Sequence, residues 1–529
     1  MIKEKVRQFV ITALQKGQKD GIFPEFDYSK ILITRPETKE HGDFSTNLSF
    51  LLSAQFKISP VALANNLVEV FLETDKEYQM FEKIESINGF INFRLCKDIY
   101  FKELKEILRK KNRYGDSLFG RRKKVQVEFI SANPTGPLTV GNARGGPFGD
   151  CLANILQKSG FISQKEYYVN NSGNQIAILG HSVLKDELSE YKGEYIEELH
   201  KENKEKDPDK VGKLAAKMII DRYIRKTTDR MDIKYDKWFF EEELHRSGKI
   251  KQIINILTDK GYTYLKDKAF WFRSTDFGDE RDRVLIKKDG QPTYLAADIA
   301  YHFNKFQERG FDKVINIWGA DHYGDVAGLK AGVSAIGFPD QLEIILLQFV
   351  TVIKDKEIIK MSKRTGTYIT MEELLDMVGS DAAKYFFLSR GADTHVNFDV
   401  DLAKQRSEAN PVFYIQYAYA RICSVLKKTG IVSSRFNPAL LKENIELELL
   451  KELAVFPDII EDVARTYQVQ KLSQYVLELA SIFHRLYQDC RMIGEDKQLT
   501  RARLNLIKAT RIVLKESLDL MNISAPKKM

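Results

Sequence analysis

The first hundred residues show two different periods of apolar and polar positions. Apolar residues recur at helical spacing near the start, in Val6, Phe9, Val10, Ala13 and Leu14. A second helical pattern covers residues 45–71, with Ser59 and Pro60 as an N-cap and first-turn pair inside it. Residues 90–95 alternate as a strand does. We therefore predict an α+β domain over residues 1–112.

A second pattern, in which strands alternate with helices, covers residues 113–400. Strands are predicted at 125–130, 166–170, 283–287, 313–318 and 343–353. Between about 180 and 260 long charged helices replace them, which predicts a helical insertion between two halves of a sheet. The alternation itself predicts an α/β domain with a doubly wound, parallel, Rossmann-like sheet. Such a sheet binds ligands at the carboxyl ends of its strands, where the strand order reverses.

From residue 401 onward the strand signals thin out and helical patterns dominate. The clearest ones cover residues 410–427, 447–466 and 473–491. We therefore predict an all-helical C-terminal domain over residues 401–529. Three domains agree with a length of 529 residues, which is too long for one hydrophobic core.

Composition narrows the class of protein. A hydrophobic content of 43% with 29% charged residues is typical of a soluble globular protein. No apolar run approaches the roughly 20 residues of a membrane span, and we expect no secretory leader. The four cysteines are far apart, which argues against a disulfide framework or a zinc site and fits the cytoplasm. A net charge of +8 permits a polyanionic partner without requiring one, and the basic clusters at 110–113 and 121–124 could equally be solvated linkers.

Two stretches could carry phosphate chemistry. In residues 124–150 a strand is followed by the turn Asn133-Pro134-Thr135-Gly136-Pro137 and by a glycine-containing helix start. The amide groups of such a helix start favour phosphate oxygens, although an ordinary strand–helix connection gives the same pattern. The second stretch is Lys360-Met361-Ser362-Lys363-Arg364. Its ammonium groups could neutralise charge as pyrophosphate leaves, although a basic pentapeptide is more often simply exposed.

Together these stretches resemble class I aminoacyl-tRNA synthetases, and the resemblance narrows to the arginyl-tRNA synthetase family. The motifs that carry it are HGDFSTN, NGFINFRL, ISANPTGPL, EYYVNNSGNQI, PTYLAADIAYH, INIWGADH, KMSKRTGTYIT, NPVFYIQYAYARI and SAPKKM. They span nearly the whole chain in the family's order, which is more specific than any one motif. The resemblance implies ATP-dependent ligation of L-arginine to tRNA(Arg) through an arginyl-adenylate, with Mg²⁺ accompanying ATP. We expect a cytoplasmic monomer that does not contact membranes.

The resemblance also implies an ATP site with one departure from the family. Its residues are Thr139, Gly141, Asn142, Gly319, Asp321, Lys360, Ser362 and Lys363, of which Thr139, Asn142, Lys360 and Lys363 are the predicted catalytic residues. The family usually has histidine where this chain has Thr139 and Asn142. Neither can carry a positive charge, although both can donate hydrogen bonds, and tryptophanyl-tRNA synthetases have a similar T-x-G-N signature. The alternatives are a non-catalytic tRNA-binding paralogue and a class I synthetase for another amino acid.

An arginine site is implied residue by residue. Its predicted residues are Asn133, Asp267, Tyr294, Asp298 and His322. A guanidinium group calls for carboxylates, and Tyr294 and Asp298 are four residues apart, on one face of a helix. Asn133 matches the residue that holds the amino-acid end of the substrate, and His322 is expected near the adenosine. Asp267 stands where the family more often has glutamate, and we expect it to reach through water.

The tRNA contacts come from the resemblance as well. Phe90 and Asn92 match positions that meet the D-loop, where an aromatic ring stacks and an amide reads a base edge. Tyr414, Tyr417 and Tyr487 match anticodon-stacking positions, and Met529 matches a position near the anticodon. Alternatively, Phe90 and Asn92 are an ordinary half-buried pair on a strand, and the three tyrosines pack in the helical core.

Overall fold

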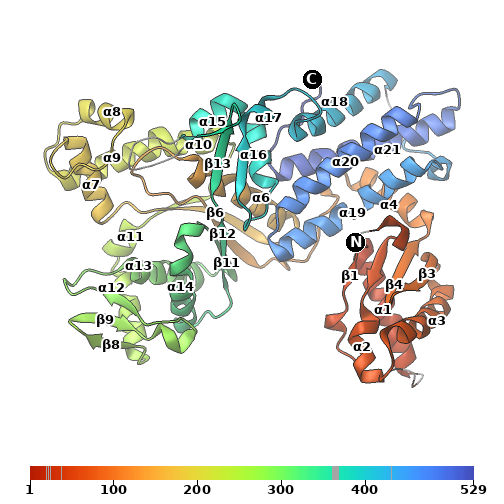
Figure 1. The fold of residues 1–529 in the computed structure, drawn as a ribbon, viewed down its shortest axis with the longest axis horizontal. Coiled ribbons are helices and arrows are strands. Elements are labelled where there is room, and N and C mark those ends of the chain that lie inside the picture. The colour runs from red at the N-terminus through yellow and green to blue at the C-terminus, as the bar shows by residue number, and fades with distance from the viewer. Residues whose placement is uncertain (20, 22, 24, 37, 360–368, 431) are drawn as a thin grey trace.

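The molecule is elongated, with the N-terminal unit and a helical insertion at opposite ends of its long axis (Figure 1). The computed structural model describes residues 1–529 except 20, 22, 24, 37, 360–368 and 431. Between the two ends lie a central parallel sheet and a bundle of C-terminal helices. The predicted fold class, a parallel α/β domain flanked by an α+β unit and a helical unit, is confirmed.

Five parallel strands form the central sheet. They are β5 (Lys124–Glu128), β6 (Ile162–Val169), β7 (Lys237–Phe240), β11 (Lys313–Gly319) and β12 (Leu342–Leu347). Their spatial order is β12-β11-β5-β6-β7, and every neighbouring pair is parallel. The chain thus leaves β5 in one direction and later returns on its other side, so the strand order reverses between β5 and β11.

Helices cover the sheet, and α6 (Gly145–Lys158) packs on β6, β5 and β11. A Cβ atom at Gly149 would lie 2.2 Å from Cγ of Phe129, so glycine is required for this approach. The other helices of this region are α11 (Glu242–Arg246), α12 (Lys249–Asp259), α13 (Tyr294–Phe303), α14 (Tyr323–Ala335), α15 (Met371–Val378), α16 (Ser380–Leu388) and α17 (Val400–Lys404).

Two predicted strands belong to other sheets. The strand predicted at 283–287 is β10 (Arg283–Ile286), which pairs antiparallel with β9 (Ala269–Phe272), itself paired with β8 (Thr263–Lys266). The second half of the run at 343–353 is β13 (Val350–Lys354), which lies between β14 (Glu357–Ile358) and β15 (Val396–Asp399). An apolar run indicates a strand, but it does not tell which strand becomes its neighbour.

The helical insertion is shorter than predicted, because β7 lies within 180–260 and is an edge strand of the central sheet. The inserted helices are α7 (Asn174–Leu184), α8 (Glu194–Glu202), α9 (Pro208–Ile219) and α10 (Arg225–Arg230), with a π-helical turn at Ile220–Ile224. The run at Lys237–Phe240 is only four residues long, and charged helices on both sides conceal it in the sequence.

A four-stranded antiparallel sheet with three helices forms the N-terminal unit. The strands, in the order β1-β2-β4-β3, are β1 (Ile33–Thr34), β2 (Phe44–Thr46), β4 (Phe90–Leu95) and β3 (Phe81–Ile87). The helices are α1 (Ile2–Lys19), α2 (Leu48–Phe56) and α3 (Pro60–Tyr78). As predicted, Ser59 caps α3 and Pro60 occupies its first turn.

The C-terminal helices are α18 (Pro411–Thr429), α19 (Asn444–Thr466), α20 (Gln470–Asp489) and α21 (Lys497–Leu520). The helix that follows the N-terminal sheet, α4 (Lys97–Lys110), packs against α19 and α21. Ion pairs from Arg35 to Glu452 (3.0 Å) and from Lys451 to Asp43 (2.7 Å) also join the two ends of the chain. Among the described residues, no helix is both long and apolar enough to cross a membrane.

Candidate active site

The carboxyl ends of β5 and β11 lie side by side where the strand order reverses, and the candidate site is built there. Directly after β5 the backbone turns through Ile130 and Ser131, both in the left-handed region with φ of 66° and 40°. This conformation is strained for a β-branched residue. The Ser131 hydroxyl accepts a hydrogen bond from the Tyr168 amide (3.1 Å), which ties the turn to β6.

The signature turn, residues 138–144, follows this strand. Thr139 caps the short helix α5 (Val140–Ala143), and its hydroxyl accepts a hydrogen bond from the Asn142 amide (3.3 Å). The same hydroxyl donates to Oδ1 of Asn142 (2.7 Å). That bond orients the Asn142 side chain, so its amide N–H groups are available to a ligand. Gly141 is exposed beside them, so neutral donors gather on one turn.

The predicted residues Lys360, Ser362 and Lys363 lie outside the described part of the chain. The segment that follows them is bound to the signature turn. Val140 N–H donates to the Ile369 carbonyl (3.2 Å), and Met371 N–H donates to the Leu138 carbonyl (2.7 Å). The chain therefore leaves the lysine stretch directly beside Thr139.

On the other side of the site, α13 carries the predicted pair Tyr294 and Asp298. Tyr294 opens the helix and is exposed, whereas Asp298 lies one turn deeper. Burial raises the pKa of the Asp298 carboxyl to about 8, and the nearby Glu128 and Glu241 carboxylates add to the shift. Within the described residues, no hydrogen bond or ion pair reaches this carboxyl. No cation of the described residues forms an ion pair with it, and Lys305, which is bound to Glu128 (2.6 Å), acts on it only through its charge.

Glu241 is a further acidic residue of this pocket, and the sequence analysis did not identify it. It follows β7, its side chain is buried, and it accepts hydrogen bonds from Tyr168 (2.9 Å) and Ser172 (2.8 Å). Its charge contributes to the raised pKa of Asp298, so the two carboxyls lie near one another. Recognising β7 as a strand would have revealed it, because Glu241 is the first residue after that strand.

The remaining predicted ligand residues lie on loops at the same edge. Nδ2 of Asn133 donates to Oε1 of Gln175 (2.6 Å) and is exposed. Gly319 ends β11, and the Asp321 side chain folds back over it, since a Cβ at Gly319 would lie 2.3 Å from Oδ1 of Asp321. The His322 ring is exposed and lies beside Trp318, with a centroid distance of 5.8 Å. These residues frame the end of β11, next to β5.

Comparison with known proteins gives three family-model matches. Residues 1–95 match the arginyl tRNA synthetase N terminal domain, residues 181–386 match the class I (R) tRNA synthetase catalytic domain, and residues 415–529 match the DALR anticodon binding domain. An arginine–tRNA ligase from Caldanaerobacter subterraneus subsp. tengcongensis is 41% identical, over 100% of this chain and 99% of the relative. One from Carboxydothermus hydrogenoformans is 42% identical, over 97% and 96%.

This chain belongs to the arginyl-tRNA synthetase family. Solved structures agree on the fold: Thermus thermophilus arginyl-tRNA synthetase aligns with a TM-score of 0.79 at 20% identity, covering 100% of both chains. Arginyl-tRNA synthetase from Plasmodium falciparum gives 0.78 at 18% identity, covering 100% of this chain and 99% of that one. The catalytic-domain match begins at residue 181, so it does not include the signature turn.

Of the residues assigned from this family, Asp267 lies on a hairpin turn. It forms the tight turn between β8 and β9 together with Lys268, with φ of 51° and 62°, and its side chain is exposed. Two consecutive left-handed residues are typical of a two-residue hairpin turn, in which aspartate is favoured. Asp267 thus has a local structural role, and Glu241 is the second acidic residue beside Asp298.

The three tyrosines assigned to the anticodon come together on the C-terminal helices. The Arg421 guanidinium lies over the rings of Tyr417 (4.4 Å) and Tyr487 (4.7 Å), and Tyr414 packs on His484 with a centroid distance of 4.3 Å. Tyr487 is exposed, so part of this aromatic cluster is open to a base. The terminal Met529 is exposed as well.

The D-loop pair differs between its two members. Phe90 is 45% exposed and packs on Phe50 with a centroid distance of 4.9 Å, so the two rings present an open aromatic face. Asn92 is only 2% exposed, and its Nδ2 has no partner among the described residues. In this structure only Phe90 offers a surface, because the Asn92 amide is covered.

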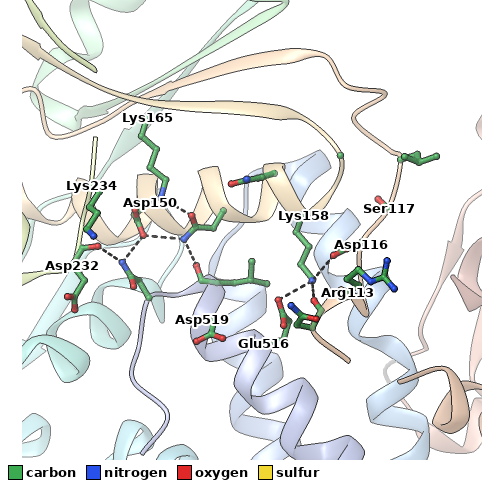
Figure 2. A pocket seen from close by; sticks show the side chains of 17 residues that line it. Arg113, Asp116, Ser117, Asp150, Lys158, Lys165, Asp232, Lys234, Glu516 and Asp519 are labelled. Carbon is green, nitrogen blue, oxygen red and sulfur yellow. Dashed lines mark hydrogen bonds and ion pairs between the residues drawn. The ribbon is translucent and has the colours of Figure 1, made fainter. Parts of the chain in front are cut away.

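A cavity of about 950 Å³ lies away from this site, between α6 and α21 (Figure 2). Lys158 pairs there with Asp116 (2.9 Å) and Glu516 (3.1 Å), and Lys165 pairs with Asp150 (2.6 Å). None of the predicted site residues lines it. Since these charges are paired internally, we interpret the cavity as a gap between packed units rather than as the arginine or ATP site.

Proposed function

We propose that this protein ligates L-arginine to tRNA(Arg) in an ATP-dependent reaction. The observation that carries the proposal is the Asp298 carboxyl, which lies near Glu241 at the carboxyl edge of the sheet and has no ion-pair partner among the described residues. A guanidinium supplies that partner, because it carries a fixed charge and five donors. Membership of the arginyl-tRNA synthetase family supports the same substrate.

The reaction has two steps. First, the arginine carboxylate attacks the α-phosphorus of ATP, and the bond to the leaving pyrophosphate breaks, which gives arginyl-adenylate. Then a hydroxyl of the 3′-terminal ribose of the tRNA attacks the arginyl carbonyl, and AMP leaves. Both steps depend chiefly on positioning and on stabilisation of phosphate charge.

In the ATP half we assign neutral hydrogen bonding to Thr139, Gly141 and Asn142. Positive charge comes from Lys360 and Lys363, with Ser362 between them. Gly319 and Asp321 bind the adenosine part at the end of β11. We propose that Mg²⁺ enters with ATP, since the triphosphate oxygens are the hard ligands that it prefers.

In the arginine half we assign the guanidinium to Asp298, Tyr294 and Glu241. Asn133 and His322 hold the end of the substrate that carries the amino and carboxylate groups. The buried carboxyls lie deep in the pocket and the loop residues at its mouth, which matches the polarity of arginine. Neutral amino acids of similar length lack the charge that Asp298 requires.

We propose that tRNA binds along the molecule from the open face of Phe90, beside the covered Asn92, to the cluster of Tyr414, Tyr417 and Tyr487, with Met529 near the anticodon. The assigned domains are 1–112 for the D-loop, 113–400 for catalysis and 401–529 for the anticodon. We further propose a cytoplasmic monomer, since the three units together supply every contact that the reaction needs.

Aminoacylation of a tRNA(Arg) transcript tests the proposal, with each amino acid supplied in turn together with ATP and Mg²⁺. Arginine alone should be transferred. Pyrophosphate exchange at background level, with arginine and tRNA present, would instead support a non-catalytic tRNA-binding paralogue. Transfer of another amino acid would contradict the assigned pocket.

A further inference from the structure

A buried arginine lies directly beneath the signature turn. Arg144 follows α5, and its side chain is 1% exposed. Its guanidinium donates hydrogen bonds to the carbonyl oxygens of Gln348, Gly391 (2.8 Å) and Thr394 (3.0 Å). All three acceptors are backbone groups, and the Nε atom has no acceptor among the described residues.

This cation is buried without a salt bridge. No carboxylate of the described residues forms an ion pair with Arg144, and Asp393 affects it only through its charge. Burial lowers the pKa of the guanidinium to about 10, so it stays charged at neutral pH. An uncompensated buried charge is costly, and an apolar side chain would fill the same space more favourably. Packing alone therefore does not account for an arginine here.

The three carbonyls belong to the base of the segment that carries the lysine stretch. Gln348 connects β12 to β13, and β13 leads through β14 to residue 359. Gly391 and Thr394 lie in the loop before β15, the strand that pairs with β13. Hydrogen bonds from Gln348 N–H to the Ala392 carbonyl (2.9 Å) and from Val396 N–H to the Phe349 carbonyl (3.1 Å) join the two chain segments.

The far end of the lysine stretch is bound to the same turn. Leu138 and Val140 exchange backbone hydrogen bonds with the segment 369–371. Residues 138–144 thus hold the chain on both sides of residues 360–368: by backbone pairing after the stretch, and through Arg144 before it.

The arginine half has no such tie to Arg144. Tyr168, Phe239, Ala297 and Tyr301 pack around Asp298 and Glu241 in a hydrophobic cluster of their own. Val140, Ala143, Leu347 and Ile369 belong to a different cluster. A substitution of Arg144 should therefore affect the use of ATP more than the binding of arginine.

We propose that Arg144 is a positioning residue for arginine activation, whose guanidinium holds the signature turn in register with the base of the lysine stretch. This inference rests on the proposed function and deepens it. Thr139 and Asn142 lie on this turn, and we assign both to the triphosphate. Arg144 holds the turn against the loops at 348 and 391–394 without touching the substrate.

The test compares Arg144→Met with Lys158→Met, at the two ends of α6. Lys158 is also a buried cation, with a side chain 5% exposed, and donates to Asp116, Glu516 and the Asn112 carbonyl (Figure 2). Both variants should lose thermal stability, because each leaves buried acceptors unpaired. In pyrophosphate exchange with arginine and tRNA(Arg), only Arg144→Met should lower kcat/KM for ATP, by about 100-fold. Its KM for arginine should stay within about twofold.

Arg144→Lys provides a second variant if the methionine variant does not fold. It keeps the charge, but an ammonium cannot reach all three carbonyls as the planar guanidinium does. We expect a loss of about tenfold in kcat/KM for ATP, again without a change in KM for arginine. A parallel rise in the KM for arginine would overturn the inference.

The outcomes separate this inference from the proposed function. If the unmodified protein shows no arginine-dependent exchange, the proposed function fails. If that exchange is present and the Arg144 variants match Lys158→Met in every kinetic constant, the proposed function stands and the positioning role of Arg144 is refuted.

Discussion

The two halves of the candidate site use opposite means to recognise charge. The arginine half places formal charges on regular elements, with Asp298 on α13 and Glu241 directly after β7. The described part of the ATP half offers only neutral donors, on a four-residue helix start that carries Thr139 and Asn142. The cations that we assign to it, Lys360 and Lys363, lie outside the described residues, and the segment 369–371 that follows them is bound to the turn by backbone hydrogen bonds.

The difference follows from the ligands. A guanidinium is permanently charged and planar, so fixed carboxylates can be matched to it in advance. A triphosphate changes its charge distribution as pyrophosphate leaves, so donors are needed on several sides at once. The two halves pack into different hydrophobic clusters, so variants in one half should leave the other half nearly unchanged.

The largest expected effect comes from Asp298→Asn. Without this carboxylate the bound guanidinium loses one of its two carboxylate partners, at a cost of about 3 kcal/mol. The KM for arginine should rise roughly 100-fold, while the KM for ATP should not change. Asp325→Asn is the matched control, because Asp325 influences the same pKa from an exposed position. An unchanged KM for arginine in Asp298→Asn would show that the pocket is assigned wrongly.

The converse variant is Asn142→Ala in the signature turn. It removes the amide donors that we assign to the ATP phosphates, and a hydrogen bond to a charged group contributes about 2 kcal/mol. Steady-state pyrophosphate exchange should show roughly a 30-fold loss in kcat/KM for ATP. If arginine binding weakened to the same extent, the separation of the two halves would be wrong.

The third prediction concerns pH and the raised pKa of Asp298. In the free protein this carboxyl is largely protonated below about pH 8, so arginine binding must release its proton. The KM for arginine should fall about tenfold per pH unit between pH 6 and 7 and level off above about pH 8. Without arginine, this group stabilises the fold below its ordinary pKa of 3.8 and loses that contribution as the pH rises through about 8.

Glu241→Gln should move the midpoint of the KM profile to lower pH, since the Glu241 charge raises this pKa. An unmoved midpoint would contradict the pairing of the two carboxyls.

The smallest effect is expected outside both halves, in the aromatic cluster of the C-terminal helices. Tyr487→Ala removes an exposed ring that lies against Arg421 and that we assign to base stacking. Its loss should weaken tRNA(Arg) binding by about 1 kcal/mol, or roughly fivefold, in a direct binding measurement. Tyr487→Phe keeps the ring and should bind normally. A wild-type affinity of Tyr487→Ala would mean that this ring serves only the helical core.

Local patterns predicted the parts of the site that lie within one element. The resemblance to the family implied Tyr294 and Asp298, and their spacing of four agrees with it, because both lie on one face of α13. Glu241 was missed because its strand is only four residues long and lies among charged helices. The hairpin position of Asp267 was not predicted, since matching residue types along a chain does not show that the residue turns a hairpin.

The sequence by itself determined most of the order of helices and strands and the α/β class of the central domain, and it indicated the two stretches that we assign to ATP. These depend on periodicity, capping residues and local motifs, all of which act over a few neighbouring positions. Only the tertiary structure decided that Glu241 lies beside Asp298 and that Arg144 binds the base of the lysine stretch. Residues 144 and 391 are hundreds of positions apart, and nothing local in the chain encodes a hydrogen bond to a distant backbone carbonyl. Such contacts exist only after the elements have packed around a shared core.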